Sequence, residues 1–296
     1  MMEENYKVFG WRGISFEIPQ NWELGAIQDS EEKGSLRFND LKITRLELEW
    51  RKERQVFSLE KIVNRYIETL RKKAKRTGLE LEIKRDLKIT PLKEKVGEFF
   101  YWKADYQSYN LISYCFRSSY LIFLRVLANL KEDIEEKVKR IYKTLRTYSL
   151  EKNLWSVYDL CVKIPKEFYL FDYSFKTGNV ELSFKRKKDF LNVRCISLAS
   201  ILLRNKDLRE LSPELCRGYL KGFKYNFGEE PCYSQDKRRG YDVIKIEGMK
   251  KIFFRTLNNE IVLIHSPYKN KIFVLRLLSK EKNSKILDQI LNEINS

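Results

Sequence analysis

The chain has 296 residues, of which 43% are hydrophobic and 33% charged, and its formal net charge is +17. This length favours about two domains, and the apolar fraction excludes a disordered chain. No stretch reaches the roughly 18 uncharged apolar residues of a membrane helix, and the polar, acidic N-terminus is not a secretory signal. We therefore expect a cytoplasmic protein without membrane insertion. Its abundant Lys and Glu are typical of thermophilic proteins, and an AT-rich genome gives a similar bias.

A short strand and a turn open the first half. Residues 11–18 alternate apolar and polar side chains, and Pro19 ends the strand because it has no N–H to donate to a sheet. Trp22, three residues further on, is predicted to fold back as an anchor of the core. After a charged turn, two more strands are expected at 36–38 and 43–50.

A helix follows these strands. Ser58 is a suitable N-cap, apolar residues recur at spacings of three and four, and Gly78 is suited to close the helix in the left-handed conformation. The sequence then predicts strands at 79–90, 98–106, 111–116 and 120–127, and an amphipathic helix at 131–147. We interpret the aromatic side chains of 99–106 as core residues, because alternate positions of a strand face inward.

The second half repeats this order after a short link at 148–155. Pro165 again ends a strand, and Phe168 stands where Trp22 stood. Ser212 and Pro213 are typical of a helix start, as N-cap and first helical residue. The other expected elements are a turn at 176–179, strands at 180–184, 191–198, 241–246, 252–257, 260–265 and 271–278, and a helix at 282–294.

The repeated order predicts an α+β fold made of two tandem domains, residues 1–149 and 150–296. Short hairpin links favour an antiparallel sheet in each domain, with helices flanking it. We therefore expect the two halves to superpose with strands and helices in the same order.

Two motifs resemble a known family. The stretch 13–22, Gly-Ile-Ser-Phe-Glu-Ile-Pro-Gln-Asn-Trp, is similar to the opening of PsbP-like domains, the fold of the photosystem II extrinsic protein and the Ran-binding nuclear import factor. The run 114–119, Tyr-Cys-Phe-Arg-Ser-Ser, followed by an apolar strand and a helix, resembles their ending. The second half departs from this pattern. Phe168 replaces the tryptophan of the opening motif, and residues 265–268, His-Ser-Pro-Tyr, replace the aromatic-Cys pair of the ending. The resemblance implies a tandem PsbP-like protein with a role in binding, usually to proteins, and no conserved chemistry.

The sequence offers few groups for catalysis. Its one histidine, His265, has no evident partner and is interpreted as a hydrogen-bonded structural residue. Phosphate-binding glycine loops, nucleophile motifs and metal-ligand spacings are missing, so no catalytic, cofactor-binding or metal-ligating residue is predicted, and no cofactor. The five cysteines are either reduced thiols or include one disulfide in the second half, where four of them lie.

Basic side chains gather in two runs. They are either solvated charges at a helix end and a hairpin tip, or contacts for a polyanion. The candidate polyanion-binding residues are Arg71, Lys72, Lys73, Lys75, Arg76, Lys185, Arg186, Lys187 and Lys188. A smaller third run occupies 237–239.

Three functional hypotheses follow. The first is a non-catalytic binding protein with a macromolecular partner, and the resemblance favours a protein. The second is a sequence-nonspecific nucleic-acid-binding protein that uses the basic runs. The third is an enzyme or ligand carrier with a cleft between the domains.

Overall fold

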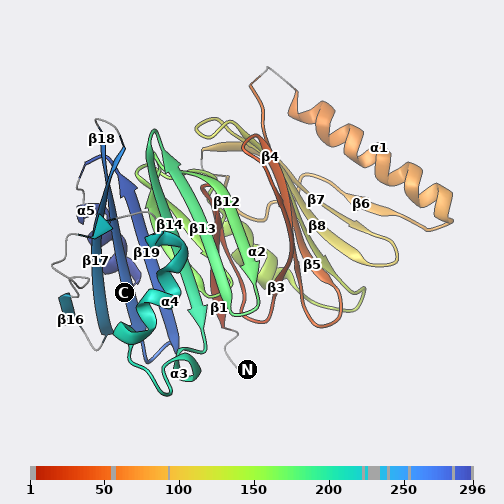
Figure 1. Ribbon diagram of the computed structural model, residues 1–296. Coiled ribbons are helices and arrows are strands. Elements are labelled where there is room, and N and C mark those ends of the chain that lie inside the picture. Colours follow the sequence, from red (N-terminus) through yellow and green to blue (C-terminus); the bar gives the residue numbers. More distant parts are fainter. Residues whose placement is uncertain are drawn as a thin grey trace. The chain divides into compact units, whose positions relative to one another are not determined.

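A computed structural model describes residues 5–54, 58–92, 94–221, 224–225, 234–238, 241–252, 255–281 and 284–294. It divides into two compact units, Met1–Ser149 (unit 1) and Leu150–Ser296 (unit 2). Figure 1 shows that each combines β-strands with helices. The strand pairs within each unit are antiparallel, as the predicted α+β class requires. No helix among the described residues is long and apolar enough to cross a membrane.

Unit 1 opens with a hairpin. Strands β1 (Tyr6–Trp11) and β2 (Ile14–Pro19) are joined by Arg12 and Gly13, whose φ angles are both positive, 49° and 79°. The prediction of one strand over 11–18 is therefore wrong, because a two-residue turn divides it. Glycine is a common residue of such turns, and Gly13 was the available signal. The predicted strand end at Pro19 is confirmed.

The main sheet of unit 1 has seven strands in the order β3-β4-β5-β9-β8-β7-β6. Its strands and helices are β3 (Glu23–Asp29), β4 (Lys33–Asn39), β5 (Thr44–Lys52), α1 (Leu59–Thr77), β6 (Glu82–Lys84), β7 (Lys95–Lys103), β8 (Gln107–Cys115), β9 (Tyr120–Ala128) and α2 (Glu135–Thr144). The sequence missed β3, and it made the strand at 79–90 too long, since only β6 forms there.

The caps of α1 are those that the sequence predicted. Ser58 Oγ accepts a hydrogen bond from the Lys61 N–H, and Gly78 adopts φ 68°. One face of the helix packs on strands β7, β8 and β9. Figure 1 shows α1 lying along the side of the sheet that holds β7 and β8. The apolar residues of this contact include Val63, Ile67, Phe100, Trp102, Ile112 and Leu121. Helix α1 thus covers one side of the sheet's β7–β9 half, which we call the outer face, and the aromatic strand at 99–106 lies largely in the core as predicted.

Unit 2 also opens with a hairpin, β10 (Lys152–Val157) and β11 (Leu160–Pro165). The order of its sheet is β12-β13-β14-β19-β18-β17-β15, with β16 paired to β17. The elements are β12 (Tyr169–Lys176), β13 (Asn179–Arg186), β14 (Asp189–Ser197), α3 (Ala199–Leu202), α4 (Leu208–Leu220), β15 (Lys224–Tyr225), β16 (Ser234–Arg238), β17 (Tyr241–Ile252), β18 (Arg255–Ser266), β19 (Lys271–Ser279) and α5 (Ser284–Ile294).

Three predictions for unit 2 need correction. The strands expected separately at 241–246, 252–257 and 260–265 are instead two long strands, β17 and β18. The link at 148–155 contains the start of strand β10. Helix α4 begins at Leu208, where Asp207 and Glu210 form a capping box, so Ser212 and Pro213 lie inside the helix. A capping box satisfies two orphan N–H groups at once, and this stronger signal precedes the Ser-Pro pair.

The two units share their construction. Strand order is the same when β3 is matched with β12, β4 with β13, β5 with β14 and β9 with β19. The Trp22 N–H donates to the Pro19 carbonyl at 3.1 Å, and the Phe168 N–H donates to the Pro165 carbonyl at 3.0 Å. Both aromatic side chains are buried, which confirms Trp22 as a core anchor.

Candidate binding surfaces

The first basic run lies at the C-terminal end of α1. All five of its cations, Arg71, Lys72, Lys73, Lys75 and Arg76, are exposed. None has an acidic partner among the described residues. The helix dipole favours cations at this end, so the fold accounts for their position, and their binding to a polyanion stays a prediction.

The second basic run occupies the end of β13 and the turn that leads into β14. Arg186 is not free: its Nη2 lies 2.8 Å from Asp189 Oδ2, and its guanidinium lies 4.4 Å from the centre of the Phe168 ring. Lys187 and Lys188 are exposed, and Lys185 is half-buried. The structure thus leaves three of these four cations available. The side chains of 237–239 lie outside the described residues.

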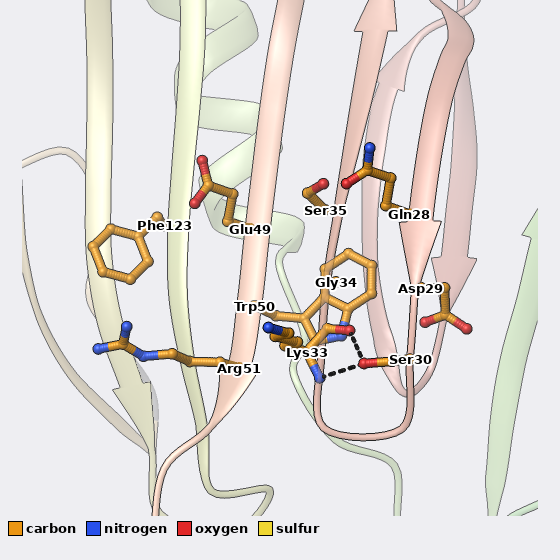
Figure 2. A pocket seen from close by; sticks show the side chains of 10 residues that line it. All are labelled: Gln28, Asp29, Ser30, Lys33, Gly34, Ser35, Glu49, Trp50, Arg51 and Phe123. Atoms are coloured by element: carbon orange, nitrogen blue, oxygen red, sulfur yellow. Dashed lines mark hydrogen bonds between the residues drawn. The ribbon is translucent and has the colours of Figure 1, made fainter.

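Unit 1 carries an open polar hollow on the outer face of β3, β4 and β5, beyond the part that α1 covers. Its volume is about 520 Å³, and it is lined by Gln28, Asp29, Ser30, Lys33, Gly34, Ser35, Glu49, Trp50, Arg51 and Phe123. Figure 2 shows these side chains spread along several strands, with the Ser30 hydroxyl bonded to the backbone of Lys33 at one end. The polar groups do not converge on one point.

The carboxylates of this hollow are already paired. Asp29 accepts two hydrogen bonds from Arg12, at 2.6 and 2.7 Å. Glu49 Oε1 lies 2.9 Å from Arg125 Nη2, and the same arginine contacts Tyr66 Oη at 3.4 Å. Burial raises the pKa of Tyr66. Since both acids are held by arginines, the hollow offers no free general base.

Unit 2 displays a different surface at the end of its sheet, which we call the apolar tip. Four large apolar side chains are exposed here, with exposed fractions of 56% for Leu198, 65% for Ile201, 37% for Leu202 and 97% for Tyr268. Three of them belong to α3 or its N-cap, and Tyr268 lies in the turn between β18 and β19. Clusters of this kind mark interaction surfaces more often than single exposed apolar residues do.

Hydrogen bonds fix the apolar tip to the sheet. Asn270, in the β18–β19 turn, accepts the Ala199 N–H on its carbonyl at 3.1 Å and the Ser200 N–H on its Oδ1 at 2.7 Å. Leu198 is held in the left-handed region at φ 61°, which is uncommon for a bulky residue. The tip was missed by the sequence analysis, although three consecutive apolar residues at 201–203 beside a predicted strand end were a usable signal.

The remaining candidate groups have local roles. His265 Nδ1 lies 3.4 Å from Asp242 Oδ2. Of the described cysteines, Cys161 is exposed and free, and Cys115, Cys195 and Cys216 are buried and free. Burial raises the pKa of Cys195 and of Cys216 to about 12. Within the described ranges, no group of three or more His, Cys, Asp or Glu residues is placed to hold a metal ion.

Comparisons with known proteins found no matching family model and no matching curated sequence. An immunity protein, TplEi of the T6SS from Pseudomonas aeruginosa, complexed with "L" peptide, is similar at 8% identity over 98% of this chain and 95% of that chain, with a TM-score of 0.34. A chain of the Tle4–Tli4 complex is similar at 6% identity over 97% of this chain and 94% of that chain, with a TM-score of 0.30. PA94, a Pseudomonas aeruginosa protein of unknown function, matches 49% of this chain and 94% of its own at 12% identity, with a TM-score of 0.27. Similarity this low carries no argument about function.

Proposed function

We propose that this protein is a non-catalytic binding protein, that its partner is another protein, and that unit 2 contacts the partner through the apolar tip. The observation that carries the proposal is the exposure of four large apolar side chains on a segment fixed by hydrogen bonds. Burying apolar side chains is the main driving force of protein association, and a preorganised segment loses little conformational entropy on binding. A PsbP-like family membership and a cytoplasmic location stay predictions.

The corresponding end of unit 1 has a similar backbone hydrogen bond. There the Glu53 N–H donates to the carbonyl of Ser119 at 2.8 Å, as the Ala199 N–H donates to Asn270 in unit 2. Phe116, in the β8–β9 turn near this anchor, is exposed.

Affinity capture from a nuclease-treated lysate of the source organism tests the proposal. We expect the parent chain to retain a protein that Ile201→Asp loses, because a buried carboxylate opposes docking of the tip. Leu41→Asp is the matched control, since Leu41 is fully exposed and belongs to unit 1, and it should retain the protein. Equal capture by the parent and both variants contradicts the assignment of the tip.

A further inference from the structure

A row of aromatic and basic side chains crosses three strands of unit 2. The register places Tyr169 of β12 opposite Lys185 of β13, and Lys185 opposite Phe190 of β14. Side chains that are paired in this way lie on the same face of a sheet. Lys185 Nζ lies 5.5 Å from the centre of the Phe190 ring. The three side chains thus form one continuous row on the outer face, the face on which α4 packs.

A bulge adds a second exposed ring beside this row. The pairing of β12 with β13 shifts at Phe171, and the ring of Phe171 lies 5.9 Å from that of Phe190 in an edge-to-face arrangement. The exposed fractions of Tyr169 and Phe171 are 45% and 51%. We call Tyr169, Phe171, Lys185 and Phe190 the aromatic strip.

Unit 1 shows that the fold does not require these rings. The equivalent row there is Glu23, Asn39 and Thr44, and the equivalent bulge residue is Gly25. A Cβ on Gly25 would lie 2.2 Å from Asn39 Nδ2, so the amide occupies the space beside the backbone. The same strands therefore form in unit 1 with polar residues or glycine at these places. Packing of the sheet does not explain the exposed rings of unit 2.

Three lysines lie in or beside the strip, together with one exposed acid, Asp172, which follows Phe171. Lys187 and Lys188 are exposed in the turn that follows Lys185 by two residues. None of these three lysines has an ion-pair partner among the described residues, whereas Arg186 and Asp189 neutralise each other. Three available cations at one end of an aromatic row match a ligand that carries flat rings and regularly spaced negative charges.

We infer that the aromatic strip binds single-stranded nucleic acid, with bases stacked on Tyr169 and Phe171 and with phosphates held by Lys185, Lys187 and Lys188. Stacking on aromatic rings combined with a basic groove is how proteins bind single strands without sequence preference. A duplex keeps its bases stacked internally, so it offers its phosphates but not its base faces to the strip. This site is separate in the fold from the apolar tip, and it goes beyond the proposed protein-binding function.

Fluorescence anisotropy with labelled mixed-sequence single strands, RNA and DNA, and with the matching duplexes tests the inference. We expect the parent chain to bind single strands more tightly than duplexes. The log–log slope of affinity against salt should be roughly −2, because about three phosphates are neutralised.

Phe171→Leu is the decisive variant, since it keeps an apolar side chain at the bulge but removes the ring. We expect it to weaken single-strand binding roughly tenfold. Phe116→Ala, which removes an exposed ring from unit 1, should leave single-strand binding unchanged, and thermal melting should show that both variants are folded.

Several results would overturn the inference. These are unchanged affinity in Phe171→Leu, equal binding of duplex and single strand, or equal competition by poly-glutamate, which would indicate an acidic protein segment as the ligand. Loss of single-strand binding in Phe171→Leu with capture through the apolar tip intact would support the strip independently of the proposed function.

Discussion

At the residue scale, the partly buried cation of Lys95 makes the stability of the fold depend on pH. Its Nζ donates to the Leu145 carbonyl at 2.9 Å, and burial, with Arg146 adding to it, lowers the pKa of Lys95 from 10.5 to about 8. Between these pH values the unfolded chain binds this proton and the folded chain does not. The contribution of Lys95 to the free energy of unfolding therefore rises as the pH increases from about 8 to about 10.5.

Replacing Lys95 by methionine should remove this rise. Urea titrations at pH 7, 9 and 10.5 measure it as the difference in the free energy of unfolding between the parent and Lys95→Met. We expect the free energy of unfolding of Lys95→Met, measured relative to that of the parent, to be highest at pH 7 and to fall as pH rises. A difference that is constant over this range would mean that Lys95 keeps an ordinary pKa in the fold.

Trp22 is the residue on which the opening turn of unit 1 depends. Because its side chain is buried, Trp22→Ala should lower the free energy of unfolding by about 3–5 kcal/mol, the range for aromatic truncation in cores. Phe116→Ala is the control, since Phe116 is exposed in the β8–β9 turn, and it should change the stability by less than about 0.5 kcal/mol. Similar melting of Trp22→Ala and the parent would contradict the core assignment.

At the scale of elements, the β3–β4 hairpin depends on the absence of a side chain at Gly34. A Cβ there would lie 2.2 Å from Cζ2 of the Trp50 ring and 2.7 Å from the Gln28 carbonyl, and Figure 2 shows the ring beside this glycine. Neither a buried ring nor a backbone carbonyl yields easily, so we expect Gly34→Ala to cost about 1–3 kcal/mol of stability.

A glycine in a helix provides the comparison. Nothing lies within 4 Å of a Cβ added to Gly218 in α4, and alanine is favoured over glycine in helices by up to about 1 kcal/mol. Gly218→Ala should therefore raise the melting temperature while Gly34→Ala lowers it. Thermal denaturation of both variants checks the pair, and a lowered melting temperature in Gly218→Ala would contradict the expected contrast.

The elements also show what the sequence could predict. Local signals were sufficient for α1, because its caps are Ser58 and Gly78, and for the strand end at Pro19. They failed where a stronger signal stood nearby, as with the capping box before Ser212. The apolar run at 201–203 was only a partial signal for the apolar tip, and the aromatic strip had no local signal. Both depend on pairing between distant segments: Ala199 with Asn270 in one, and Tyr169 with Lys185 and Phe190 in the other.

At the scale of the whole chain, the same strand order is used twice with different surfaces. Unit 1 has a polar outer face whose acids are paired with arginines, whereas unit 2 has the apolar tip and the aromatic strip. Since the scaffold of unit 1 forms without the rings of the aromatic strip, we expect binding to depend chiefly on unit 2 side chains. A superposition of experimental structures of the two units should match their strands and helices in order.

The central claim, that a protein docks on the apolar tip, is tested most directly by site-specific photo-crosslinking in the source organism. A photoreactive aromatic residue at position 268 should form a covalent adduct with one protein, and Ile201→Asp in the same chain should abolish that adduct. The same photoreactive residue at position 41 should give no adduct. Absence of an adduct at 268, or the same adducts from both positions, would contradict the account.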